Sequence, residues 1–224
     1  MGKRVILCCT ACMLLGAVML GCKKHQELRA PSQYTINCAD WGKWAYFSFE
    51  QGKEVAVDNP KNDLSWDIGF HRYDFKTNGG LSGKGQGTAC KTTATQIEQL
   101  TKLPAPLQWV VDEQASCLMN FDFSSMGTSS SASQYDDTQT RNPALSGRSK
   151  VEEFTVGKLK GRLARFYENG IVIQTFGMPP EYDLAPYVYL VRTAKGRVVR
   201  FKVTHIMDEK GNRGIVSFNY AFLE

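Results

Sequence analysis

The C-terminal part of the chain most constrains the fold, because it contains three long runs whose composition indicates strands. Residues 187–192, 197–207 and 214–222 are rich in β-branched and aromatic side chains, which suit a pleated, half-buried surface. The stretches between them, 193–196 and 208–213, each contain a glycine. Short glycine-containing connections commonly join neighbouring antiparallel strands. We therefore predict a three-stranded antiparallel meander.

A second strand signal lies in WDIGFHRYDF at 66–75. Large apolar side chains occupy every second position from Trp66 to Phe70, as expected of a strand with one buried face. The aromatic spacing continues through Tyr73 and Phe75 with a shifted phase. This shift predicts a bulge or bend.

Helical periodicity is weak along the whole chain. Residues 93–103 could form one short helix, 158–167 fit either a helix or a strand, and the aromatic stretch 44–49 favours a strand. The 203 residues from Cys22 onward are enough for one sizeable core or two small ones. We predict an all-β fold, with antiparallel sheets in a single sandwich-like domain and few helical turns.

The first 22 residues have the features of an export signal. Two cations, Lys3 and Arg4, precede an apolar run of 16 residues, which is short for a membrane span and typical of a signal peptide. The run ends in Gly21-Cys22, which resembles a bacterial lipobox, where the cysteine is acylated and becomes the mature N-terminus. An uncleaved anchor helix or an ordinary signal peptide is the alternative. The predicted division is a lipoprotein signal peptide at 1–22, a flexible tether at 23–36 and an all-β domain at 37–224.

The other cysteines form no metal motif. Those at positions 8, 9 and 12 spell CCxxC, but they lie in the signal peptide and would be removed. The mature chain keeps three besides the lipid carrier: Cys38, Cys90 and Cys117. An odd number permits at most one intramolecular disulfide, and the pairing stays open.

The charge balance argues against nucleic acid as a partner. Removing Lys3 and Arg4 lowers the formal charge from +5 to +3, and no dense Lys/Arg cluster remains. The acyl anchor is then the only membrane contact expected.

No motif supports an enzyme. The chain lacks a G-x-S-x-G nucleophile turn, and SGKGQGT at 82–88 matches neither common phosphate-loop pattern. We expect His71 to be hydrogen-bonded in a polar patch, with a metal or general-base role as the alternative. His205 is expected to pack on the apolar face of its strand. The adjacent acids Asp136 and Asp137 are expected to be solvated rather than to serve glycoside chemistry.

Two segments interrupt the strand pattern, and each carries one methionine. Residues 124–147 are rich in Ser, Thr and Gly and lack periodicity, and a loop of this length is either functional or disordered. Residues 177–180 read GMPP, a rigid turn between two apolar runs. The methionines are Met126 and Met178.

Taken together, several segments resemble the HmuY family of haem-binding lipoproteins from Bacteroidetes. They are the lipobox, KNDLSWDIGFHRYDF at 61–75, the SGKGQG loop and the terminal run from YVYLVR to SFNY. The middle of the chain, roughly 90–170, matches loosely. The resemblance implies an all-β domain shaped like a hand, which grips one haem between loops and passes it to a TonB-dependent outer-membrane receptor.

The resemblance also implies that HRYD is a structural strand and that the iron ligands come from two later loops. The best-known member uses a pair of histidines there, but neither loop of this chain contains one. Alignment places Met178 near the second ligand position, and Met126 is the soft donor in the first loop. Met119 and Tyr135 remain alternative first ligands.

Several residues are candidates for the haem pocket. Aromatic walls could come from residues near the two methionines: Phe123, Tyr135, Phe176 and Tyr182. Arg141 is a candidate partner for the haem propionates. We expect a lipid-anchored, non-catalytic haemophore-like protein of the outer membrane, facing either the periplasm or the outside, with host haem-carrying proteins as candidate donors. The alternative is a surface adhesion or glycan-binding lipoprotein on the same scaffold that does not bind haem.

Overall fold

The computed structural model describes residues 30–40, 42–122, 135–156, 159–175 and 181–223. Within 115–139 and 148–168 it describes the backbone alone. The first strand begins at Ser32, inside the stretch predicted to be a tether. In the described ranges, every helix is too short or too polar to cross a membrane.

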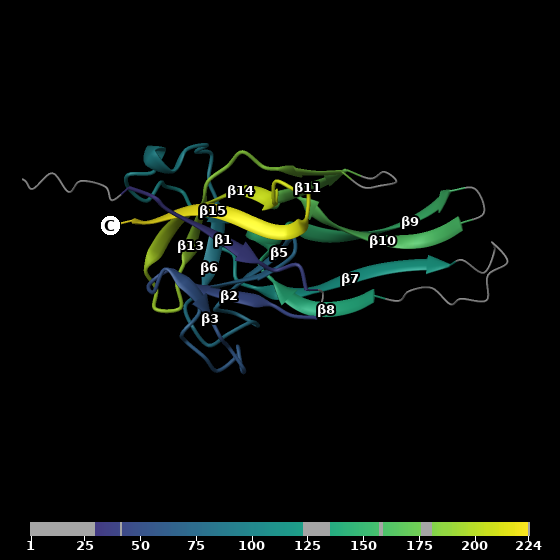
Figure 1. Cartoon of the computed structure of the whole chain (residues 1–224), viewed down its shortest axis with the longest axis horizontal. Helices are drawn as coiled ribbons and strands as arrows, with labels where there is room; N and C mark the ends of the chain where they lie inside the picture. Colours follow the sequence, from purple (N-terminus) through teal and green to yellow (C-terminus); the bar gives the residue numbers. More distant parts are fainter. Residues whose placement is uncertain (1–29, 41, 123–134, 157–158, 176–180, 224) are drawn as a thin grey trace, which may run out of the picture.

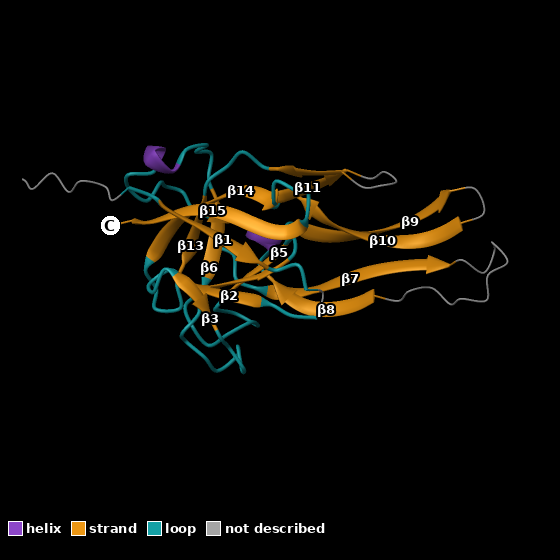
Figure 2. Cartoon of the chain, in the orientation of Figure 1, coloured by secondary structure: helices purple, strands orange, loops and turns teal. Residues whose placement is uncertain are grey.

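Two antiparallel sheets pack face to face and form the body of the protein (Figure 1, Figure 2). The first has five strands, in the order β1 (Ser32–Asn37), β15 (Arg213–Leu223), β14 (Val198–Met207), β13 (Tyr189–Arg192) and β6 (Thr88–Lys91). The second has four, in the order β3 (Lys53–Val55), β2 (Ala45–Ser48), β4 (Ile68–His71) and β5 (Asp74–Thr77). The all-β prediction is confirmed, and so is the meander, which is β13–β14–β15.

A layer of aromatic rings between the two sheets forms the core. Phe218 of β15 lies 5.2 Å, centroid to centroid, from the rings of Phe47, Phe70 and Phe201. All four side chains are fully buried. Burial of one such side chain contributes about 1.5–3 kcal/mol, and a ring pair adds about 0.5–1.5 kcal/mol. Phe218 therefore links strands of both sheets.

The stretch WDIGFHRYDF is a hairpin of two strands, β4 and β5. His71 pairs with Asp74, so the connecting turn is Arg72–Tyr73. This turn explains the shifted aromatic phase, because Phe70 and Phe75 face each other across the hairpin with ring centroids 5.6 Å apart.

The prediction that His205 packs in the core is wrong. The register of β14 against β15 shifts on both sides of His205, and this bulge reverses the inward and outward positions that follow it. Ile206 is buried, while His205 is exposed and lies 3.2 Å from the hydroxyl of Thr204.

Two further sheets lie at the end of the sandwich away from the C-terminus. One has the order β8 (Tyr135–Arg141), β7 (Glu113–Asp122), β10 (Leu159–Glu168) and β9 (Arg148–Val156), and the other pairs β11 (Val172–Thr175) with β12 (Glu181–Leu184). Figure 1 shows β7–β8 and β9–β10 projecting beyond the sandwich on this side. We call the β7–β8 hairpin the first arm and the β11–β12 hairpin the second arm.

The structure corrects the predictions of a short helix at 93–103 and of a segment without regular structure at 124–147. Only the 3-10 turn η1 (Ile97–Gln99) forms within 93–103. The stretch 158–167, which fitted either a helix or a strand, lies largely in strand β10. The segment expected to be irregular contains β8 and the short helix α1 (Pro143–Ser146). The polar sequence YDDTQTR has little strand signal of its own and is held by pairing with β7. Asn142 caps α1 by accepting a hydrogen bond from the backbone N–H of Ala144.

We expect Phe218→Ala to lower the free energy of unfolding by about 3–5 kcal/mol, because it leaves a cavity between the sheets. Urea denaturation followed by fluorescence measures the change. Met207→Ala is the control on the partner strand. Its side chain is 39% exposed, so the effect should stay within about 0.5 kcal/mol. Equal losses in the two variants would contradict the central role of Phe218.

Candidate functional site

The polar residues of HRYD form a buried cluster at the base of the first arm. Arg141, the last residue of β8, places its Nε 2.9 Å from Oδ1 of Asp74, and Nδ1 of His71 lies 3.8 Å from Oδ2. His71 also stacks on Trp44, with ring centroids 5.3 Å apart. Since His71, Asp74 and Arg141 are at most 4% exposed, contacts among these side chains replace the water that an exposed carboxylate would bind.

This cluster gives His71 a structural role. Its ring lies between an indole and a carboxylate, and among the described residues no three or more His, Cys, Asp or Glu side chains gather as a metal site. Arg141, predicted to meet haem propionates, is 2% exposed and directed at Asp74.

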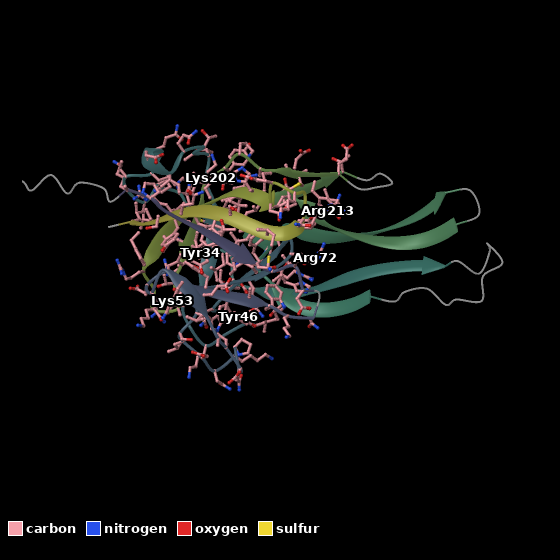
Figure 3. The ribbon with its side chains drawn as sticks, viewed as in Figure 1. Tyr34, Tyr46, Lys53, Arg72, Lys202 and Arg213 are labelled. Atoms are coloured by element: carbon pink, nitrogen blue, oxygen red, sulfur yellow. The ribbon has the colours of Figure 1, made fainter. Side chains whose placement is uncertain are left out.

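An aromatic and cationic group lies where the second arm meets the sandwich. We call residues 71–74 the HRYD turn. The ring of Tyr73 in this turn packs on Tyr182 of β12, with centroids 4.4 Å apart. The guanidinium of Arg213 lies 5.0 Å from the Tyr182 centroid. Tyr73 is buried, Tyr182 is half-buried and Arg213 is exposed. Figure 3 shows Arg213 and Arg72 at the end of the body from which the arms extend.

A buried carboxylate, Asp112, joins the first arm to the second sheet. It directly precedes β7 and accepts hydrogen bonds from the Thr77 backbone N–H (2.8 Å), the Thr77 hydroxyl (2.6 Å) and the Asn142 amide (2.9 Å). Nearby, the Ser82 hydroxyl donates to that of Thr140 in β8, at 2.6 Å. Burial raises the pKa of Asp112 to about 6, although these donors favour the charged form.

Most of the predicted site residues lie outside the described side chains. Five fall outside the described residues altogether: Cys22, Phe123, Met126, Phe176 and Met178. Tyr135 opens β8 and pairs with Met119 of β7, but the side chains of this pair are not described. Arg141 and Tyr182 are the two candidates whose side chains are described.

Chain connectivity nevertheless locates the two methionines relative to the arms. Met126 belongs to residues 123–134, which connect β7 to β8, and Met178 belongs to residues 176–180, which connect β11 to β12. The two predicted ligands therefore belong to the connecting segments of two different hairpins.

Arg213, Tyr73 and Asp112 were not among the candidate site residues predicted from the sequence. Arg213 is the last residue of the glycine-containing connection 208–213, and nothing local relates it to Tyr182, which lies 31 positions earlier. Asp112 follows the run WVV without a motif. Such positions become informative only when the fold brings distant strands together.

The chain matches a known family over most of its length. The profile of the family described as HmuY protein matches residues 40–220, which include both arms and the HRYD turn. No curated protein matches the chain.

Several solved structures share the fold. A protein of Bacteroides fragilis assigned as a lipoprotein has a TM-score of 0.57 at 21% identity, covering 87% of this chain and 90% of its own. A HmuY-like haem-binding protein of Bacteroides vulgatus has a TM-score of 0.56 at 20% identity, covering 87% and 92%. The apo form of a HmuY analogue from Tannerella forsythia has a TM-score of 0.57 at 19% identity, covering 88% and 99%. At these identities the likeness shows the fold alone.

We expect Asp112→Asn to flatten the pH dependence of stability between about pH 4 and pH 7. Because the folded pKa of Asp112 is raised, its stabilising contribution is fully present below the unfolded pKa of 3.8 and is lost as pH rises through about 6. Over this range the free energy of unfolding of the wild type should fall relative to the variant by on the order of 3 kcal/mol. Urea denaturation across the pH range measures it.

Asp58→Asn, in an exposed loop, is the matched control and should keep the wild-type pH profile. If the Asp112 and Asp58 variants gave parallel profiles, the buried carboxylate would not be the source of the pH dependence.

Proposed function

The chain belongs to the HmuY family, and on this basis we propose that it is a haem-binding outer-membrane lipoprotein that captures haem and passes it to a TonB-dependent receptor. The proposal rests on the family match over residues 40–220. It is supported by the fold shared with a Bacteroides vulgatus protein described as haem-binding. Haem would be captured and released by exchange of its iron ligands, without a catalysed reaction. Acylation of Cys22 would hold the domain at the membrane.

The proposed iron ligands are Met126 and Met178, one from each arm. A thioether is a soft, uncharged donor that raises the haem potential and favours reduced iron more than imidazole does. Because methionine does not titrate, this ligation should persist at acidic pH, where a histidine ligand would be protonated.

The histidines of the chain support a methionine pair by their positions. The chain has three, at 25, 71 and 205, and none lies in the connections of the two arms. His71 is buried between Trp44 and Asp74, and His205 is exposed on β14 of the five-stranded sheet. Met119 and Tyr135 remain alternative first ligands, because a thioether and a phenolate are both known haem donors. Their backbones pair with each other in the β7–β8 ladder.

The residues around the second arm include an aromatic ring and an exposed cation, which could contact the porphyrin and its two propionate carboxylates. Tyr182 offers a half-buried ring, and at most about 14 Å of extended chain separates it from Met178. Arg213 beside that ring is exposed, whereas Arg141 is directed at Asp74, so we assign the propionate-binding role to Arg213. Phe123, Tyr135 and Phe176 stay as candidate walls of the pocket.

One surface feature favours the rival function, a glycan-binding or adhesive lipoprotein that binds no haem. A hollow of about 460 Å³ is lined by Ala56, Leu64 and several polar side chains that could bond sugar hydroxyls: Asp58, Asn59, Asn62, Asp63 and Lys84. This lining contains no aromatic ring on which a sugar could stack. Haem binding is therefore the function that the observations support better.

We expect the exported domain to shift the Soret band of added haem, and Met126→Ala and Met178→Ala each to weaken haem binding by at least about tenfold. Absorption titration at pH 7 and pH 5 measures both the affinity and the predicted acid tolerance. Met207→Ala removes an exposed methionine from β14 and should bind as the wild type does.

The titration also separates the alternatives. A spectrum of free haem with the wild type would favour the glycan-binding rival. Tight binding that neither methionine substitution weakens would leave the family function standing and refute the methionine ligands.

We expect Arg213→Gln to weaken haem binding about two- to fivefold, the range for one exposed ion pair. The binding of haem dimethyl ester, which lacks the propionate charges, should not change. Arg197→Gln is the matched control, because Arg197 is also exposed and already pairs with Glu50 at 2.9 Å. An equal loss of affinity for haem and its ester would show that Arg213 does not bind the propionates.

A further inference from the structure

The HRYD turn contacts the bases of both arms. On one side, Asp74 forms the 2.9 Å ion pair with Arg141, the residue that ends β8. The neighbouring Phe75 carbonyl accepts a hydrogen bond from the Asn142 backbone N–H at 2.9 Å. The first arm is thus attached to β5 by an ion pair and a backbone hydrogen bond at consecutive positions.

On its other side the same turn holds the second arm. The Tyr73 ring packs on Tyr182 with centroids 4.4 Å apart. Tyr182 pairs with Gln174, one position from the pair Thr175–Glu181 that precedes the connection 176–180. In sequence, Tyr182 is two positions from the connection that contains the proposed second ligand.

The turn itself is fixed to the body of the protein. Arg72 has a φ of 53°, a left-handed conformation that costs a residue other than glycine about 1–3 kcal/mol and persists only when its surroundings impose it. Its backbone N–H donates to the Cys38 carbonyl at 3.0 Å, and its Nη1 donates to the Ala39 carbonyl at 2.9 Å. Contacts from outside the hairpin therefore hold the turn in one conformation.

We propose that Tyr73 and Asp74 are positioning residues that set the separation and relative orientation of the two arms. The part of this inference that concerns haem rests on the proposed function. The seven residues of β8 extend about 24 Å, so a rotation of about 5° at the base would move the far end by about 2 Å. Two axial ligands on one iron tolerate little displacement of this kind.

The first test needs no haem. We expect Asp74→Asn to speed amide hydrogen exchange about tenfold or more in β7 and β8 and to spare β11 and β12. Tyr73→Ala should speed amide exchange in β11 and β12 and spare β7 and β8. Tyr73→Phe keeps the ring contact and should restore the wild-type pattern. Mass spectrometry of peptides from each arm gives the readout.

Two matched controls separate positioning from general destabilisation. Asp67 is also a buried aspartate, but it accepts hydrogen bonds from the Ser48 hydroxyl and from the backbone N–H groups of Phe49 and Ala194. Tyr46 is also a buried tyrosine, and it packs on Trp66. Asp67→Asn and Tyr46→Ala should raise exchange without preference for either arm. If the Asp74 and Tyr73 variants behaved like these controls, the positioning role would be refuted.

The second test uses bound haem. In Asp74→Asn and Tyr73→Ala we expect a shift of the absorption spectrum from six- to five-coordinate iron, whereas the two controls keep the wild-type spectrum. Unchanged coordination in all four variants would refute the link to the ligands. If the wild type binds no haem, the proposed function fails, while the exchange experiment still decides whether the turn positions the arms.

Discussion

The packing of two sheets against one shared aromatic layer is the constraint on which the rest of the structure depends. Phe218 contacts Phe47, Phe70 and Phe201 at once, so strands far apart in the sequence must keep their register for the layer to close. A slip of one residue would turn each ring toward water. The arms extend from this body and take their direction from it.

Where the first arm joins the sandwich, buried carboxylates are the connecting groups, whereas the second arm is held by the ring contact between Tyr73 and Tyr182. Asp112 organises three donors from Thr77 and Asn142, and Asp74 pairs with Arg141. A buried charge demands specific partners, whereas apolar contacts tolerate sliding. The polar groups at the base of the first arm therefore restrict its orientation relative to the sandwich. The proposed haem site, with one ligand from each of two hairpins, would require such a fixed orientation.

The sequence predicts those parts of the fold in which the local residue pattern matches the burial that the folded structure imposes. The meander β13–β14–β15 has strand-forming residues separated by glycine-containing turns. Strand β8 has a polar sequence and is stabilised by pairing with β7. His205 was misplaced because the bulge in β14 leaves no local signal. Tyr182 could be proposed from its place next to GMPP, but Arg213 enters the site only through tertiary contact with Tyr182.

Among the described side chains, two buried thiols bear on the chemistry expected of the chain if it is exported as proposed. Burial raises the pKa of Cys38 to about 12 and that of Cys90 to about 11, and both are unpaired. At neutral pH only about one Cys90 side chain in 10⁴ would be a thiolate, the form that oxidants attack. In the oxidising compartment that the proposed export implies, this burial would protect Cys38 and Cys90 from being cross-linked to neighbouring proteins.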